Sequence, residues 1–190
     1  TLSHFVKLFN YVAATFVVAI FFMSCSSENS ELPDLNDEVP KPVEISINTT
    51  ILYSDSAVLR LKIVTPELQR WTNLETPYVE FPKGLNLFFY DSLGNVESTL
   101  KADYAINYTE DKRVEVKHNV EVVNGKEEIL NTEHLIWLQK EEKIYTEEFV
   151  KITTPDEIIY GDGLEANQQF TKYRIKNIKG TIAVDEDSLQ

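Results

Sequence analysis

LKADYAINYTEDKRVEVKHNVEVV, residues 100–123, is followed by LNTEHLIWLQKEEKIYTEEFVKIT, residues 130–153, and the two stretches align without a gap. The alignment places Val114 over Ile144, and each copy contains two β-like runs joined by a charged turn. A third, more degenerate copy begins near Tyr160. A repeat of this length is typical of stacked supersecondary units, none of which buries its apolar face alone. The repeat therefore predicts an elongated sheet whose two end strands can pair with another protein.

Apolar and polar residues alternate along most of the chain after its first 42 residues. The alternation is clearest at residues 59–63 and 114–122, and a period of two is typical of half-buried antiparallel strands. Turn signals rich in Gly, Pro, Asn and Asp separate these runs. One short helix is predicted at residues 66–72, because Thr65 suits the N-cap and a proline suits the first helical position. Apart from this helix, the predicted fold class is all-β.

The first 24 residues resemble a targeting segment. Lys7 precedes an apolar run at residues 11–23. This run is shorter than the about 20 residues that a membrane-spanning helix needs, and it fits a secretory signal. Cys25 follows directly, as in the lipobox of bacterial lipoproteins, whose cysteine is acylated. We predict a signal peptide at residues 1–24 and a lipid anchor on Cys25; the alternative is an uncleaved signal anchor.

The stretch after Cys25 changes in composition. Residues 25–42 are polar and acidic and contain three prolines, a composition that cannot form a core and is typical of a flexible tether. The folded domain is predicted at residues 43–185, and a short tail at residues 186–190. The tether would hold this domain away from a membrane.

Composition and motifs argue against catalysis and against nucleic acid. The chain has 18 basic and 31 acidic residues, a net charge of −13, which is unsuited to neutralising phosphates. His118 and His134 are too isolated for a zinc site. Adjacent carboxylates such as Glu141 and Glu142 would point to opposite faces of a strand, and the single cysteine cannot form an intramolecular disulfide. We therefore predict a protein that is not an enzyme and has no metal or cofactor.

One face of the predicted strands is apolar. Val114, Val116, Val120 and Val122 share one parity. A second sheet can cover such a face, as in a compact sandwich, or the face can line a groove for acyl chains in a partly open jelly roll. The sequence leaves both possibilities open.

Aromatic residues suggest a different kind of surface. Phe88, Phe89, Tyr90 and Trp137 would stack on sugars if they lay exposed and coplanar on one face. The alternative function is therefore a surface lipoprotein with a carbohydrate-binding β-sandwich. The simpler interpretation of these residues is core packing.

Several stretches, in their order and spacing, resemble the LptC-type periplasmic component of the lipopolysaccharide export bridge, in its Bacteroidetes-like form. The resemblance covers residues 53–183. The stretches are YSDS at 53–56, YVEFPKG at 78–84, FYD at 89–91, LKADYA at 100–105, LNTEHLIW at 130–137, IYTE at 144–147 and IYGDGLE at 159–165. The chain departs from the pattern at Lys117-His118-Asn119, where a glycine is expected before the asparagine.

The resemblance implies a twisted, V-shaped, OstA-like β-jelly roll that is open along one side. It implies a periplasmic protein, anchored to the inner membrane, that accepts lipopolysaccharide from an inner-membrane ABC transporter. The N-terminal edge would meet the permease and ATPase complex, and the C-terminal edge a soluble LptA-type bridge protein. The edge residues expected to meet these partners are Val43, Ile45, Ile47, Tyr173, Ile175 and Ile182.

The acyl chains of lipopolysaccharide would travel in an apolar groove lined by residues of like parity. The residues expected to line it are Leu59, Leu61, Leu87, Ile106, Val114, Val116, Val120, Val122, Ile136, Ile144, Val150 and Ile152. Burial of acyl surface is non-directional and contributes about 25 cal/mol per Å², so a chain can slide along such a groove.

Overall fold

Eleven antiparallel strands and one short 3-10 turn make up residues 40–183, the part of the chain that the computed structural model describes. The all-β fold class is confirmed, and the strands form one sheet wound as a jelly roll. The turn η1 (Gln139–Glu141) precedes β9. The strands are β1 (Glu44–Asp55), β2 (Val58–Trp71), β3 (Tyr78–Phe81), β4 (Leu85–Tyr90), β5 (Val96–Ala102), β6 (Tyr104–Tyr108), β7 (Arg113–Asn124), β8 (Ile129–Leu138), β9 (Lys143–Thr153), β10 (Glu157–Asn167) and β11 (Tyr173–Ala183).

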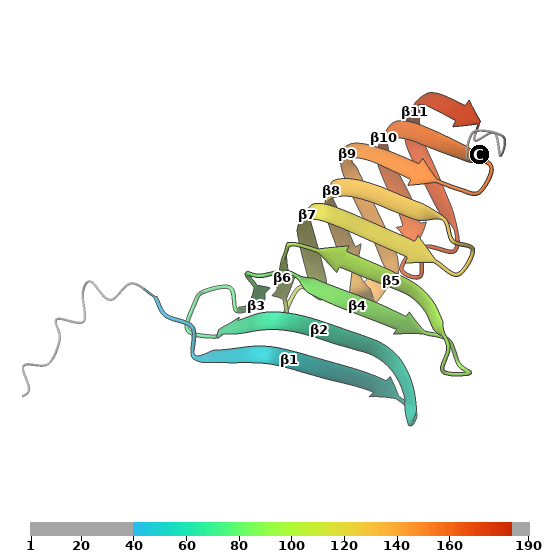
Figure 1. Ribbon diagram of the computed structural model, residues 1–190. Coiled ribbons are helices and arrows are strands. Elements are labelled where there is room, and N and C mark those ends of the chain that lie inside the picture. Colours follow the sequence, from blue (N-terminus) through green and yellow to red (C-terminus); the bar gives the residue numbers. More distant parts are fainter. Residues whose placement is uncertain (1–39, 184–190) are drawn as a thin grey trace, which may run out of the picture. The chain divides into compact units, whose positions relative to one another are not determined.

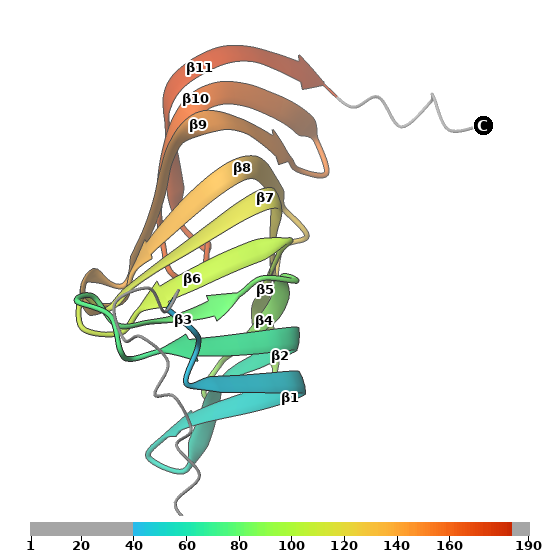
Figure 2. The same ribbon diagram turned by 90° about the vertical axis from the view of Figure 1, so that its left-hand side faces the viewer.

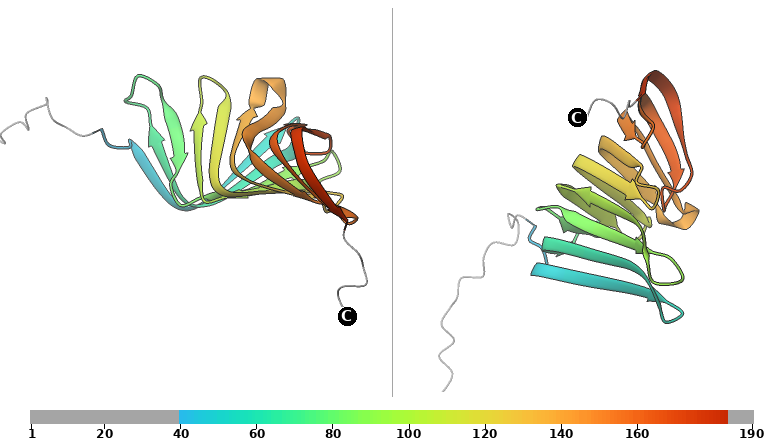
Figure 3. Two further views of the ribbon diagram at one scale, coloured as in Figure 1. Left: turned by 90° about the horizontal axis from the view of Figure 1, so that it is seen from above. Right: turned by 45° about the vertical axis from the view of Figure 1, so that its right-hand side comes forward.

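Two long strands connect the two halves of this sheet. β2 pairs with β4 through residues 61–64 and with β3 through residues 69–71. β7 pairs with β6 through residues 113–117 and with β5 through residues 121–124. We call the half that contains β4 and β5 leaf A, and the half that contains β3 and β6 leaf B. The strands β8 to β11 continue both leaves, which meet at a bend (Figures 1 and 3).

The bend depends on residues with unusual backbone angles. In β7 it falls at His118 and Asn119, whose φ angles of 64° and 51° are left-handed, and the register with β8 shifts there. Asp103, between β5 and β6, lies at the same corner, because its N–H donates to the His118 carbonyl at 3.0 Å. The Asn119 amide donates to the Asp103 carboxylate at 2.5 Å. A histidine thus adopts the conformation for which the family pattern led us to expect a glycine.

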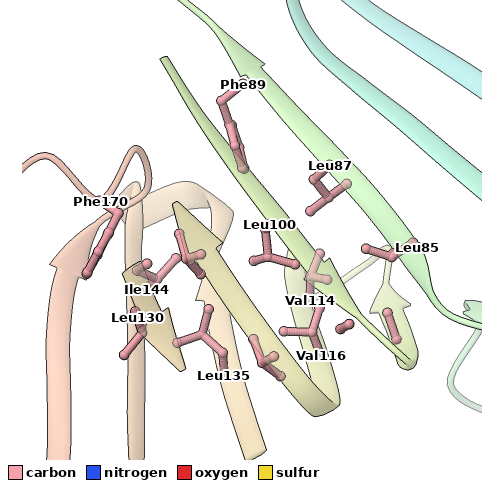
Figure 4. Packing of buried hydrophobic residues seen from close by; sticks show 14 of the residues in the cluster. Leu85, Leu87, Phe89, Leu100, Val114, Val116, Leu130, Leu135, Ile144 and Phe170 are labelled. Carbon is pink, nitrogen blue, oxygen red and sulfur yellow. The ribbon is translucent and has the colours of Figure 1, made fainter. Parts of the chain in front are cut away.

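The hydrophobic core lies between the leaves, on the face that we call inner. Side chains from nearly every strand contribute to it, and Figure 4 labels ten of them. Leu130, Val150, Ile152 and Leu164 have no exposed surface. The inner faces of the two leaves therefore pack against each other, so the apolar face has its own partner within the fold.

The prediction of a helix at residues 66–72 is wrong, because residues 66–71 belong to β2. Pro66 lies opposite Asn48 at an interruption in the β1–β2 pairing, where a strand tolerates a proline. Instead of capping a helix, the buried Thr65 hydroxyl donates to the Gly84 carbonyl at 2.8 Å. Pairing with β1 and β3 satisfies the backbone groups that a helix would have satisfied internally, so tertiary contacts override the local signal.

The predicted signal peptide, the anchor on Cys25 and the tail at residues 186–190 lie outside the described residues, as does most of the tether. Within residues 40–183, no helix is long and apolar enough to cross a membrane. The strand β1 begins at Glu44 and β11 ends at Ala183.

Candidate functional site

The inner face of leaf A carries an uninterrupted row of apolar side chains. Each residue in the row is the direct cross-strand partner of the next, over eight strands. At about 4.8 Å between neighbouring strands, the row is roughly 34 Å long. Its members are Ile51, Ile63, Leu87, Leu100, Val122, Leu130, Ile152 and Ile159. The sheet therefore presents one continuous apolar track from β1 to β10.

Most of the predicted groove residues lie on this inner face. Leu59 shares the parity of Leu61 in β2, and it is half-buried. Nine of the twelve belong to the core or pack against it: Leu61, Leu87, Val114, Val116, Val120, Val122, Ile144, Val150 and Ile152. The parity argument thus places these residues correctly, although their contact with a lipid stays a prediction.

Ile106 and Ile136 lie on the other face, so their expected place in the groove is wrong. Both are cross-strand partners of Glu115, and direct partners share a face. The positions of β6 that face inward are Ala105, which is fully buried, and Asn107. The error arose because one parity was assumed from residue 106 to residue 152, whereas the parity changes at the bend between β5 and β6 and within β8. Ala102 and then Ala105 are the inward residues on the two sides of the bend, and in β8 they are Thr132 and then Leu135.

The interior opens into a cleft at the ends of the leaves. This cleft has a volume of about 600 Å³. Phe89 and Leu61 reach it from leaf A, and Trp137 reaches it from leaf B. All three also contact the core, so the cleft is continuous with the apolar interior. Its outer rim is polar, with Asp55, Arg60, Asp91, Glu97, Glu142, Gln168 and Gln169 among the lining residues.

Two contacts close the leaves against each other beside this cleft. The rings of Phe89 and Trp137 meet edge to face, with centroids 5.5 Å apart and an angle of 76°. The Asn124 side chain, at the end of β7 in leaf A, donates to the Phe170 carbonyl in the β10–β11 loop of leaf B at 2.9 Å. We call this second contact the clasp.

Phe170 was not recognised from the sequence. Its side chain has no exposed surface, its φ angle is 55°, and its ring stacks on Tyr173 at 4.8 Å. Burial raises the pKa of the Tyr173 hydroxyl, and the nearby carboxylates of Glu128 and Glu157 raise it further. A lone aromatic within the polar loop NQQFTK was the available signal, since such a loop has no local reason to carry one.

The two histidines lie away from the interior. His118 is exposed at the bend, 3.9 Å from Glu133. His134 Nε2 lies 3.5 Å from the buried carboxylate of Glu115, on the outer face. Arg113 and Lys117 also contact that carboxylate, at 2.8 and 3.3 Å, so Glu115 serves as the shared anion of three basic side chains. Across residues 40–183, no cluster of three or more His, Cys, Asp or Glu side chains is placed to hold a metal ion.

The two end strands are β1 and β11, at opposite ends of the sheet (Figure 2). Val43, Ile45 and Ile47 are each more than half exposed, as is Ile182. By contrast, Tyr173 and Ile175 are partly buried and pack against the core. Exposed apolar side chains therefore lie at the start of β1 and in the final part of β11, whereas the first residues of β11 pack against the core.

The four aromatic residues considered for sugar stacking do not form one flat surface. Phe89 and Trp137 are steeply inclined to each other in the interior. Phe88 lies on the other face of β4, with the Lys62 amine 5.4 Å from its ring centre. Core packing accounts for the inward pair, and no observation on these residues favours a carbohydrate site.

Comparison with known proteins gives one family. No curated protein matches the chain. A family model described as lipopolysaccharide-assembly, LptC-related, matches residues 12–183.

Proposed function

The chain belongs to the LptC-related family of lipopolysaccharide-assembly proteins, and from this premise we propose that it carries lipopolysaccharide along its inner face, from an inner-membrane ABC transporter to a soluble bridge protein. Membership makes it a component of lipopolysaccharide transport in the periplasm, associated with the inner membrane. Members of this family act in transport and are not catalysts.

The observation that supports carriage most directly is the apolar row that crosses eight strands without a polar interruption. An acyl chain laid across the strands would meet only aliphatic side chains. Its contacts would be equivalent at each step, because apolar burial has no preferred direction. The row therefore suits a cargo that advances from strand to strand.

Loading requires the leaves to part. The inner faces are packed against each other, and Val120, Leu130 and Val150 have no exposed surface. Acyl chains would replace the contacts between the leaves with contacts of similar chemistry, so the exchange costs little apolar burial. The cleft between Leu61, Phe89 and Trp137 is the proposed entrance.

The two end strands are the proposed partner surfaces. β1, which carries the exposed Ile45 and Ile47 and follows the exposed Val43, would pair with the permease complex, and β11 with an LptA-type bridge protein. Strand addition of this kind uses the unpaired backbone groups of an edge for affinity. It would join the sheet of each protein to that of the next.

Membrane attachment is proposed through an acylated Cys25. Replacement of Cys25 by alanine should then abolish incorporation of labelled fatty acid and release the protein from the membrane fraction. Retention of the Cys25→Ala variant in that fraction would instead favour the uncleaved signal anchor.

Photo-crosslinking in living cells tests the proposed carriage. A photoreactive residue replaces Val122, which lies in the apolar row and is 2% exposed. The matched control is Glu121, the adjacent residue of β7, which is exposed on the outer face. Glu115, another outward residue of β7, would be a poor control, because replacing it would leave three basic side chains without their shared carboxylate.

Carriage predicts capture of lipopolysaccharide from position 122 and none from position 121. Capture should also depend on ATP hydrolysis by the transporter. A folded protein that captures no lipopolysaccharide from position 122, while the cell exports it normally, would refute carriage along the inner face.

A further inference from the structure

Three buried polar atoms lack a hydrogen-bond partner on the inner face within the described residues. They are Ser98 Oγ, Asn107 Oδ1 and Trp137 Nε1. Ser98 is only 2% exposed. A buried polar group without a partner is rare in folded proteins, and each such group calls for an explanation.

All three residues lie far from the bend, near the ends of the leaves where Phe89 meets Trp137; we call this place the seam. Ser98 is the cross-strand partner of Phe89, whose ring meets that of Trp137. Asn107 and Trp137 lie on either side of Val114 in one cross-strand row of leaf B. The inner positions closer to the bend, such as Ala102 and Ala105, are apolar and buried. The polar groups of the inner face therefore differ by position. Near the bend, the buried Thr65 and Thr132 hydroxyls donate to main-chain carbonyls, whereas the polar atoms of Ser98, Asn107 and Trp137 have no partner within the described protein.

Unpartnered polar groups at one end of an apolar interior suit the structure of an acylated lipid. Acyl chains are purely apolar along their length, but each begins at an ester or amide group, and hydroxyl groups lie close by in hydroxylated chains. The Trp137 N–H can donate to a carbonyl oxygen, Asn107 Oδ1 can accept from a hydroxyl or amide N–H, and the Ser98 hydroxyl can do either.

We propose that Ser98, Asn107 and Trp137 form a polar rim that binds the ester, amide and hydroxyl groups at the head of acyl chains, while the chains lie deeper, toward the bend. This inference rests on the proposed carriage of lipid. It adds that the groove distinguishes a hydroxyacylated sugar lipid from a plain hydrocarbon. No protein group pairs with these rim atoms, and the cargo would supply their partners.

The proposal predicts different effects of one substitution on the stability of the fold and on the affinity for lipid. Ser98→Ala removes a buried hydroxyl that has no partner, so the unfolding temperature should stay unchanged or rise. The same variant should bind lipid A about fivefold more weakly, which is the usual effect of losing one hydrogen bond. Asn107→Leu, which is similar in shape, should behave in the same way.

Thr65→Val is the matched control. Thr65 is 1% exposed, and its hydroxyl donates to the Gly84 carbonyl at 2.8 Å, so this variant removes a hydroxyl that has a partner. It lies at the bend, away from the rim. Its unfolding temperature should fall by several degrees, and its affinity for lipid A should not change.

The experiment measures equilibrium binding of two probes to the full chain: lipid A, and a pyrene-labelled alkane without ester, amide or hydroxyl groups. The rim variants should lose affinity for lipid A and keep their affinity for the alkane. A lower unfolding temperature for Ser98→Ala would mean that water already satisfies the hydroxyl, and would overturn the proposal. Unchanged affinity for lipid A in both rim variants would also overturn it. If the unaltered protein binds neither probe, the proposed carriage itself fails.

Discussion

The Asn124 side chain and the Phe170 carbonyl are joined by a buried hydrogen bond of 2.9 Å, although the two residues are 46 positions apart and lie in different leaves. Phe170 adopts a left-handed φ of 55° in making this contact, which costs a residue other than glycine about 1–2 kcal/mol. The clasp and the buried Phe170 ring offset that cost. Together they hold closed the seam beside which the entrance cleft lies.

Asn124→Ala should destabilise the fold and loosen the seam. The variant leaves the buried Phe170 carbonyl without its partner, and it also removes the bonds that Asn124 Oδ1 accepts from the N–H groups of Lys126 and Glu128. We expect the free energy of unfolding to fall by at least about 1–3 kcal/mol. Urea denaturation measures this change. Asn86→Ala, at an exposed position of β4, is the control and should be nearly neutral. Equal stability of the two variants would show that the clasp contributes nothing.

His118→Gly should stabilise the protein. The φ of 64° at His118 suits glycine, and the exposed contact with Glu133 at 3.9 Å contributes little. After allowing for the greater entropy of the unfolded chain, we expect a gain of about 0.5–1 kcal/mol. The neighbouring Lys117→Gly, at ordinary strand geometry, should lose at least a similar amount, because it also gives up the contact with Glu115 at 3.3 Å. A loss for His118→Gly in chemical denaturation would contradict this account of the bend.

Gly161→Ala should displace β11 from β10. A Cβ at this position would lie 2.5 Å from Ile175 Cγ2 and 2.6 Å from the Asn177 carbonyl, both in β11. We expect a loss of about 1–3 kcal/mol, together with faster amide hydrogen exchange in β11. Gly180→Ala is the control, because its Cβ would have no neighbour within 4 Å. Similar exchange rates in the two variants would argue against the close approach.

Proline substitutions at Arg174 and Ile175 separate the stability of β11 from its pairing with a partner. Successive N–H groups of a strand point to opposite sides, so one of these two residues directs its N–H toward β10 and the other toward the unpaired edge. Proline at the first should lower the unfolding temperature. Proline at the second should leave the fold intact and abolish co-purification of the bridge protein. Normal co-purification of that intact variant would rule out strand addition at β11.

The C-terminal end of the sheet should weaken in acid. The Lys143 amine lies 3.1 Å from the Glu165 carboxylate, and hydrogen bonding to Lys143, with Lys176 also nearby, lowers the pKa of Glu165. A carboxyl whose pKa is lower in the folded state stabilises the fold above its unfolded pKa, about 4.3, and this stabilisation is lost as the pH falls through the folded value. Unfolding temperatures at pH 7, 5 and 3 should therefore fall less steeply for Glu165→Gln. Parallel profiles would contradict the role of Glu165.

Much of the fold could be predicted from the sequence because period-two alternation is a local property of a strand. The alternation of Val114, Val116, Val120 and Val122 placed all four on the inner face, and the repeat anticipated that units stack into one sheet with two ends. The matched stretches also indicated the family, which the comparison with the family model confirms.

Elements and contacts that depend on residues far apart in the sequence were decided only by the tertiary structure. The stretch that begins at Pro66 carries a helix signal, but pairing with β1 and β3 makes it a strand. Without the register of β6 against β7, the sequence does not show whether Ile106 or Ala105 faces inward. The clasp, the buried Phe170 and the unpaired Ser98 hydroxyl arise only when two leaves close together. Local sequence determines the face on which a side chain lies, whereas the chain's long-range pairing determines what that face meets.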